Sequence, residues 1–210
     1  MNIGIIGPGK IGSGLGKIWA QKGHHITFCY SRDAEKLKRM AAIVPNAASS
    51  DIQEAVRKSE VILLSVVWEA VEEALKSAGS MDGKIVIDCT NPTKKDLSDL
   101  AVGHVTSAAE EIAKRIPGAR VVKAFNTVFA DVYHSDSRLF GTRKPTMFYC
   151  GDDNEAKQIV SKLIIDAGFE SCDAGALKNA RYLEPLAMLM IQLGYGQDMG
   201  TNIALNLINR

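Results

Sequence analysis

The order of features at the start of the chain constrains its fold most. An apolar run, Asn2 to Ile6, leads directly into Gly7-Pro8-Gly9-Lys10-Ile11-Gly12, and an amphipathic stretch then continues to Lys22. A G-x-G-x-x-G spacing between a strand and a helix is typical of a βαβ unit, because the first glycine permits a tight turn and the third lets the helix approach the strand. The sequence therefore predicts a strand, a glycine turn and a helix over residues 10–22.

The same alternation of Ile- and Val-rich runs with charged amphipathic runs continues through the first half of the chain, which favours a parallel sheet. A second helix is expected over residues 33–40, with a cap at Ser31 or Asp33, and a short strand near Ala47. The other strands are expected at residues 2–6, 25–30, 61–65, 84–88, 121–125, 146–150 and 169–173. The predicted fold is a Rossmann-like, doubly wound α/β fold with a mostly parallel sheet and a short helical C-terminal extension.

The length of 210 residues suits one large domain with a small appendage, which we divide into residues 1–175 and 176–210. A net charge of +1 gives no reason to expect a nucleic acid or an anionic membrane as partner. The longest apolar run, residues 61–68, is too short to span a bilayer, and the N-terminus has no charged region typical of a signal peptide.

Cysteine and histidine usage indicates neither disulfides nor a metal site. The four cysteines are far apart, form no CxxC, and lie in or beside predicted strands, which is typical of reduced core residues in a cytoplasmic protein. The four histidines also lack the spacing of metal ligands. These residues are Cys29, Cys89, Cys150 and Cys172, and His24, His25, His104 and His134.

The glycine turn predicts a dinucleotide site. The second glycine, Gly9, lets the backbone approach a pyrophosphate, whose charge is favoured at a helix N-terminus. NAD-selective sites usually place Asp or Glu at the end of the second strand, but here Ser31 and Arg32 stand there. A hydroxyl and a guanidinium suit a 2′-phosphate, and Lys36 would add charge if the helix began early enough to include Arg32. We therefore expect NADP(H); the alternative is that Ser31 only caps the helix while Asp33 holds a ribose.

Two segments have less definite roles. Residues 131–144 read as a long loop, a kind of segment that is often functional. The last segment carries one apolar helical stripe and further apolar residues outside it, so it either closes the sheet or packs on a second copy in a homodimer. The stripe consists of Leu183, Leu186, Ala187, Met190 and Gly194, and the others are Met188, Leu189 and Leu193.

Motifs along nearly the whole chain resemble the NADP-dependent oxidoreductases of coenzyme F420, a 5-deazaflavin, and their bacterial relatives. They are GPGKIGSGL, SRDAEK, LLSVVWEAV, VIDCTNP, VVKAFNT and YLEPLAMLMIQLGYGQDMGT. The resemblance implies a Rossmann domain and hydride transfer between NADP(H) and the deazaflavin. It also implies that loops after the later strands surround the nicotinamide, with Ser65, Val66, Trp68, Thr90, Asn91, Pro92, Ala124 and Asn126.

The sequence gives no acid-base constellation, so no catalytic side chain is assigned. Asn91 and Asn126 either bond the cofactor or satisfy loop backbone, and Lys123 is expected in the strand or on its surface. Hydride transfer between two flat rings requires stacking and exclusion of water more than proton transfer. The alternatives are an NADPH-dependent flavin or ferric reductase, an imine or keto reductase, and a non-catalytic NADP(H)-binding sensor.

Overall fold

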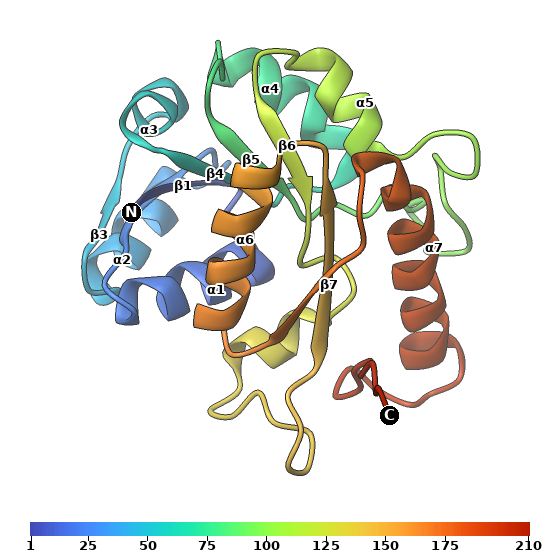
Figure 1. The fold of residues 1–210 in the computed structure, drawn as a ribbon. Coiled ribbons are helices and arrows are strands. Elements are labelled where there is room, and N and C mark those ends of the chain that lie inside the picture. Colours follow the sequence, from blue (N-terminus) through green and yellow to red (C-terminus); the bar gives the residue numbers. More distant parts are fainter.

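A computed structural model describes residues 1–210. The chain forms one eight-stranded sheet with helices between the strands, and the strand order is β3-β2-β1-β4-β5-β6-β7-β8 (Figure 1). Neighbouring strands from β3 to β6 are parallel, β7 runs antiparallel to β6, and β8 is parallel to β7. The strands are β1 (Asn2–Ile6), β2 (His25–Cys29), β3 (Ala47–Ser49), β4 (Val61–Leu64), β5 (Ile85–Asp88), β6 (Arg120–Lys123), β7 (Thr146–Gly151) and β8 (Glu170–Asp173). The predicted doubly wound, mostly parallel α/β fold is confirmed.

Helices cover both faces of the sheet, and each face has its own apolar core. Helices α1, α2 and α6 pack on one face and helices α3, α4 and α5 on the other, with α7 beside α5 (Figure 1). The helices are α1 (Lys10–Gln21), α2 (Ala34–Ile43), α3 (Ile52–Lys58), α4 (Val71–Ala78), α5 (Ala108–Arg115), α6 (Asn154–Asp166) and α7 (Ala180–Ile191). Both faces of the central strands are covered, which explains their uninterrupted Ile, Val and Leu runs.

The register of the sheet brings several loops to one edge. Ile6 pairs with Cys29 on one side and Leu64 on the other, Leu64 pairs with Asp88, and Asp88 pairs with Lys123. The residues that follow these strands therefore lie along the carboxyl edge of the sheet. The strand order reverses between β1 and β4, and ligands of open α/β sheets bind in the crevice at such a point.

The C-terminal segment is joined to the sheet at several places. After α7 the chain makes one turn of π-helix, Gln192–Gly196, and then returns alongside β7, where the Thr146 amide donates to the Leu205 carbonyl at 2.9 Å. Within α7, the stripe residues Leu183, Ala187 and Met190 are buried, whereas Leu189 is 53% exposed. The division of the chain at residue 175 stays a prediction.

Candidate functional site

The glycine turn has the geometry that its sequence predicts. Gly7 has φ +81°, and a Cβ there would lie 2.4 Å from Val66 Cγ1. A Cβ at Gly12 would lie 2.4 Å from Ser65 Oγ, so these two positions hold α1 tightly against the neighbouring strand and loop. At Gly9, by contrast, a Cβ would meet no atom within 4 Å. The turn is therefore packed on the protein side and open at Gly9.

The N-terminus of α1 is free to receive an anion. Gly9 is its N-cap and provides no side-chain hydrogen bond, and the first turn contains no acidic residue. The first N–H groups of a helix lack partners within it, and the helix dipole favours negative charge there. The space beside Gly9 thus fits a pyrophosphate group held by backbone amides.

The end of β2 forms the second part of the site. Asp33 caps α2, since its Oδ1 accepts from the Lys36 amide at 2.9 Å, while Ser31 Oγ accepts from the Asp33 amide at 3.1 Å. Asp33 Oδ2 also accepts from Arg39 at 3.3 Å. A hollow of about 390 Å³ opens here, lined by Tyr30, Ser31, Ala34, Leu37, Lys38, Ser49, Ser50, Asp51 and Ile52. Of the predicted phosphate-binding residues, Ser31 lines this hollow.

The expectation for Lys36 depended on a helix that included Arg32, and that condition is not met. Helix α2 begins at Ala34, because Asp33 takes the cap position. Arg32 therefore precedes the helix and does not share a helical face with Lys36, although both side chains are exposed. Lys38, which the sequence analysis did not single out, lines the hollow instead.

The loop after β4 lies directly against the glycine turn. Ser65 Oγ donates to the Gly7 carbonyl at 2.7 Å, and Val66 contacts Gly7 as described. Trp68 opens a short 3-10 helix, Trp68–Ala70, and its half-buried side chain packs against the core on the α4 face. Ser65 and Val66 thus lie at the glycine turn, and the expected role of Trp68 at the nicotinamide stays a prediction.

The loops after β5 and β6 are joined by two asparagines. Asn91 Nδ2 donates to the Asn126 carbonyl at 2.9 Å, and Asn126 Nδ2 donates to Asn91 Oδ1 at 3.1 Å and to the Leu183 carbonyl at 2.9 Å. Thr90, Pro92 and Ala124 are buried beside them. The asparagine side chains thus tie the two predicted loops to each other and to α7.

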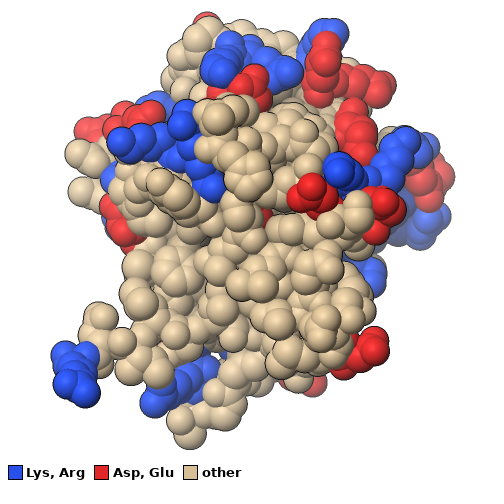
Figure 2. Space-filling model, turned by 90° about the vertical axis from the view of Figure 1, so that its right-hand side faces the viewer, with Lys and Arg blue, Asp and Glu red and all other residues tan.

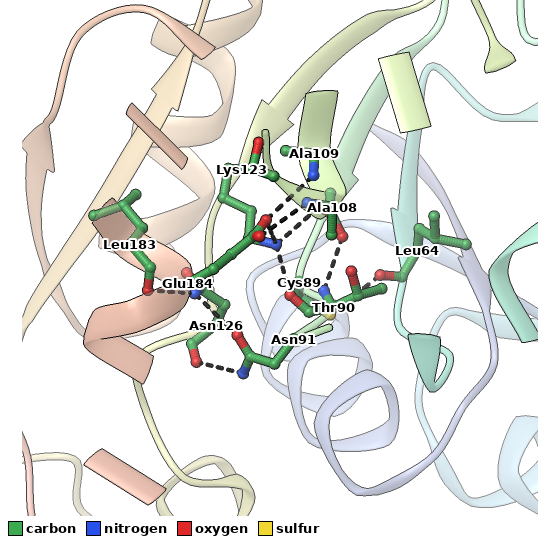
Figure 3. Close-up of polar contacts among 12 residues, drawn as sticks. Leu64, Cys89, Thr90, Asn91, Ala108, Ala109, Lys123, Asn126, Leu183 and Glu184 are labelled. Carbon is green, nitrogen blue, oxygen red and sulfur yellow. Dashed lines mark hydrogen bonds and ion pairs between the residues drawn. The ribbon is translucent and has the colours of Figure 1, made fainter. Parts of the chain in front are cut away.

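A buried charged cluster that the sequence did not predict lies behind these loops (Figure 3). Lys123 Nζ lies 2.9 Å from Asp88 Oδ2 and 2.9 Å from Glu184 Oε1, and it donates to the Thr90 carbonyl at 2.6 Å. Lys123 lies in strand β6, as one of its two expected locations has it, but all three charged side chains are at most 1% exposed, so the alternative location on the surface is wrong. A signal was present, because Lys123 and Glu184 each interrupt an apolar run.

The electrostatics of the cluster follow from its burial. Burial alone would lower the pKa of Lys123, but the combined charges of Asp88 and Glu184 raise it above its ordinary value. Burial raises the pKa of Glu184, and the attraction of Lys123 opposes that rise only in part. Two backbone donors also serve the Glu184 carboxylate, the amides of Ala108 at 2.8 Å and Ala109 at 3.2 Å.

The predicted loop at residues 131–144 begins within a short 3-10 helix, Ala130–His134, that packs against α1. Lys10 Nζ lies 3.7 Å from Asp131 Oδ1, and His134 Nε2 lies 2.7 Å from the Lys10 carbonyl. Thr201 Oγ1 donates to Asp131 Oδ2 at 2.7 Å. The start of the loop therefore lies between the glycine turn and the C-terminal segment.

All four cysteines are free, and burial raises the pKa of Cys29 and of Cys150 to about 12. No group of three or more His, Cys, Asp or Glu side chains is arranged to hold a metal ion. No helix has the length and apolar character needed to cross a membrane.

Comparison with known proteins shows which families the chain is similar to. The family model described as NADP oxidoreductase coenzyme F420-dependent matches residues 2–92. An F420-dependent NADP reductase of Methanothermobacter marburgensis is 33% identical over 214 residues, which cover 92% of this chain and 92% of the relative. A crystal structure from Arthrobacter sp. FB24 shares the fold with a TM-score of 0.89, full coverage of both chains and 24% identity.

A second kind of relative is longer. The metalloreductase STEAP3 of Rattus norvegicus is 32% identical over 190 residues, which are 90% of this chain but 37% of the relative. This chain therefore spans little more than a third of the length of that metalloreductase.

Proposed function

This chain belongs to the family of coenzyme F420-dependent NADP oxidoreductases, and we propose that it transfers a hydride between NADP(H) and a flat acceptor such as the 5-deazaflavin coenzyme F420. The observation that carries the proposal is the N-terminus of α1, which has no side-chain cap, no acidic residue in its first turn and open space at Gly9. A pyrophosphate fits this position by charge and by space. The similarity to an NADP reductase over nearly the full length of both chains supports the same conclusion.

Residues at the glycine turn and at the end of β2 would hold the pyrophosphate and the adenosine part of NADP(H). The turn over residues 7–12 would bind the pyrophosphate through backbone amides, and Ser31 would face the adenosine from the hollow at the end of β2. Arg32, which is exposed beside this hollow, would reach a 2′-phosphate and form charge-assisted hydrogen bonds with it. Lys36 would contribute charge from the first turn of α2 without a direct contact.

The nicotinamide end of the cofactor is proposed to lie among the loops after β4, β5 and β6. When bound, NADP(H) supplies the hydride chemistry itself. The chain's residues fix the ring and exclude water: Ser65 and Val66 border the glycine turn, while Asn91 and Asn126 hold their loops in one arrangement. The reduced acceptor takes up one proton as well as the hydride, and no side chain is assigned to supply that proton. Thr90 and Ala124 are buried beside the two asparagines.

The first experiment is to measure NADPH oxidation by the purified protein with coenzyme F420, FMN and FAD offered separately and with NADH as the control donor. We expect turnover with NADPH and the deazaflavin and much slower turnover with NADH. Tight NADPH binding without reduction of any acceptor would contradict the enzymatic proposal and leave a cofactor-binding sensor. FMN and FAD test the alternative of a flavin reductase, and the similarity to a metalloreductase makes a ferric complex a further acceptor to test.

The face that α7 presents to solvent supports a proposal of homodimer formation. Figure 2 views this side and shows a broad area without Lys, Arg, Asp or Glu. Tyr182, Leu189 and Tyr195 are each more than half exposed there, and apolar patches of this kind mark interfaces. Light scattering at micromolar concentration should give twice the chain mass, and Leu189→Glu should return it to the monomer value.

The free cysteines suit a cytoplasmic location, which we include in the proposal.

A further inference from the structure

The proposed function assigns no role to the buried cluster of Asp88, Lys123 and Glu184. Its members come from the ends of β5 and β6 and from α7. Figure 3 shows the side chains of Lys123 and Glu184 directed toward each other beside Thr90. Removing three charges from water is costly, and apolar side chains of similar volume often replace a buried ion pair without loss of stability. The contacts of the cluster therefore point to a role beyond stability.

All three N–H donors of the Lys123 ammonium group have hydrogen-bond acceptors. An ammonium has three N–H donors, and three acceptors lie within 2.9 Å of Nζ: Asp88 Oδ2, Glu184 Oε1 and the Thr90 carbonyl. One of the three acceptors is thus the backbone of the loop that follows β5.

The pair of Asp88 and Lys123 fixes both backbone groups of Thr90. Asp88 Oδ1 accepts from the Thr90 amide at 2.8 Å, while Lys123 donates to the Thr90 carbonyl at 2.6 Å. The next residue, Asn91, is the one whose side chain bonds Asn126 in the loop after β6. The cluster therefore sets the backbone from which the proposed nicotinamide-end contacts project, a task that apolar replacements could not perform.

One turn of α7 completes the arrangement. Glu184 pairs with Lys123 and also accepts from the amides of Ala108 and Ala109 at the start of α5. The preceding residue, Leu183, accepts from Asn126 through its carbonyl. Adjacent residues of α7 thus hold the loops after β5 and β6 together.

We propose that Lys123 and Glu184 are positioning residues for hydride transfer, which set the 90–91 turn and Asn126 against the nicotinamide end of the cofactor. The inference rests on the proposed function. The adenosine end is held by the glycine turn and by Ser31, which lie outside these contacts. Loss of either positioning residue should therefore disturb one end of the dinucleotide and spare the other.

The test uses the full chain with Lys123→Met, Glu184→Gln and the control Arg181→Gln. Arg181 bonds Glu110 at 2.8 and 2.6 Å and so also joins α7 to α5, but it touches neither loop. The readouts are the melting temperature, the Kd of 2′,5′-ADP, the Kd of NADPH, and the single-turnover rate of NADPH oxidation by the acceptor that serves the wild type best. The fragment 2′,5′-ADP lacks the nicotinamide and reports the adenosine end alone.

For both positioning variants we expect an unchanged Kd for 2′,5′-ADP, a higher Kd for NADPH, and a transfer rate lower by on the order of 100-fold, as a small misplacement of reactants produces. Arg181→Gln should lower the melting temperature and leave the rate and both Kd values unchanged. Equal losses for 2′,5′-ADP and NADPH, or a rate loss no larger than that of Arg181→Gln, would overturn the inference. If Lys123→Met does not fold, the isosteric Glu184→Gln decides.

The same measurements separate this inference from the proposed function. A wild type that reduces none of the acceptors refutes the proposed hydride transfer. The comparison of NADPH with 2′,5′-ADP still tests whether Lys123 and Glu184 set the nicotinamide end, since binding needs no acceptor.

Discussion

Replacing Gly9 by alanine tests the cofactor site with little disturbance of the fold. Gly9 has φ −70° and ψ −159°, which alanine adopts without strain, and the new Cβ meets no protein atom within 4 Å. The methyl group would instead stand at the uncapped start of α1, in the space that we assign to the pyrophosphate. The variant should therefore fold normally and bind NADPH poorly.

The expected magnitudes follow from the contacts concerned. Alanine is a poorer N-cap than glycine, but it also lowers the entropy of the unfolded chain, so the free energy of unfolding should change by no more than about 1 kcal/mol, or about 2–4 °C in melting temperature. A hydrogen bond to a charged group is worth about 1.5–3 kcal/mol. Losing one amide-to-phosphate bond should therefore raise the Kd of NADPH about 10- to 150-fold.

The assay is a fluorescence titration with NADPH beside thermal unfolding followed by circular dichroism. Gly7→Ala is the matched control, because a Cβ at this positive φ would lie 2.4 Å from Val66 Cγ1. That control should lose stability, whereas Gly9→Ala should lose binding. An NADPH affinity of Gly9→Ala within about twofold of the wild type, a difference of only about 0.4 kcal/mol, would refute the placement of the pyrophosphate.

Three further predictions test other parts of the molecule. Arg32→Ala should raise the Kd of NADPH about 10- to 150-fold while leaving that of NADH unchanged; an unchanged NADPH affinity would exclude the phosphate contact. With a thiol reagent at neutral pH, Cys172 should react first because the other three cysteines are buried, and burial raises the pKa of Cys29 and Cys150 to about 12; a second fast thiol would contradict this. Hydrogen bonding to Arg181 lowers the pKa of Glu110 below its ordinary value of 4.5. The pair therefore stabilises the fold fully at pH values above 4.5, and this stabilisation is lost as the pH falls through the lowered pKa. Urea unfolding of Arg181→Gln should therefore show a deficit of about 1 kcal/mol at pH 7 that shrinks in acid; a deficit independent of pH would exclude the pair as its cause.

The elements of the fold could be predicted because their causes are local. The run at residues 2–6 is buried from its second residue onward and became β1 with the expected bounds, and the short strand near Ala47 is β3. Gly7 and Gly12 sit where the turn requires them, since each would clash if it carried a Cβ. In these cases a few neighbouring residues determine the structure.

The first residue of helix α2 could not be determined from the periodicity of the sequence. Helix α2 could have been capped at Ser31 or Asp33, and the hydrogen bond from the Lys36 amide to Asp33 decides for the later start. That choice removes Arg32 from the helix and with it the shared face expected for Lys36. Both residues are good caps, so only the geometry of the turn after β2 distinguishes them.

The charged cluster was missed for a different reason. Lys123 is 35 residues from Asp88, and Glu184 is 76 residues from the Ala108 amide that it accepts from. A single sequence shows that a charge interrupts an apolar run, but it does not show which distant charge compensates it. The usual interpretation of such a lysine is a side chain that reaches the surface, and here the antiparallel β7 and helix α7 close over it.

Contacts between residues close in sequence build one end of the proposed cofactor site, and contacts between distant residues build the other. The adenosine end is formed by the glycine turn, the end of β2 and the β3–α3 connection, all close together in sequence. The nicotinamide end depends on contacts between residues 88–91, 123–126 and 183–184, so it exists only after α7 has docked. A sequence can therefore reveal a dinucleotide motif clearly without revealing the acceptor. The acceptor contacts the nicotinamide end of the site, which is built by contacts between residues far apart in the sequence. It follows that changes at Leu183 and Glu184 of α7 should alter the choice and rate of the acceptor before they alter the affinity for the adenosine half of NADP(H).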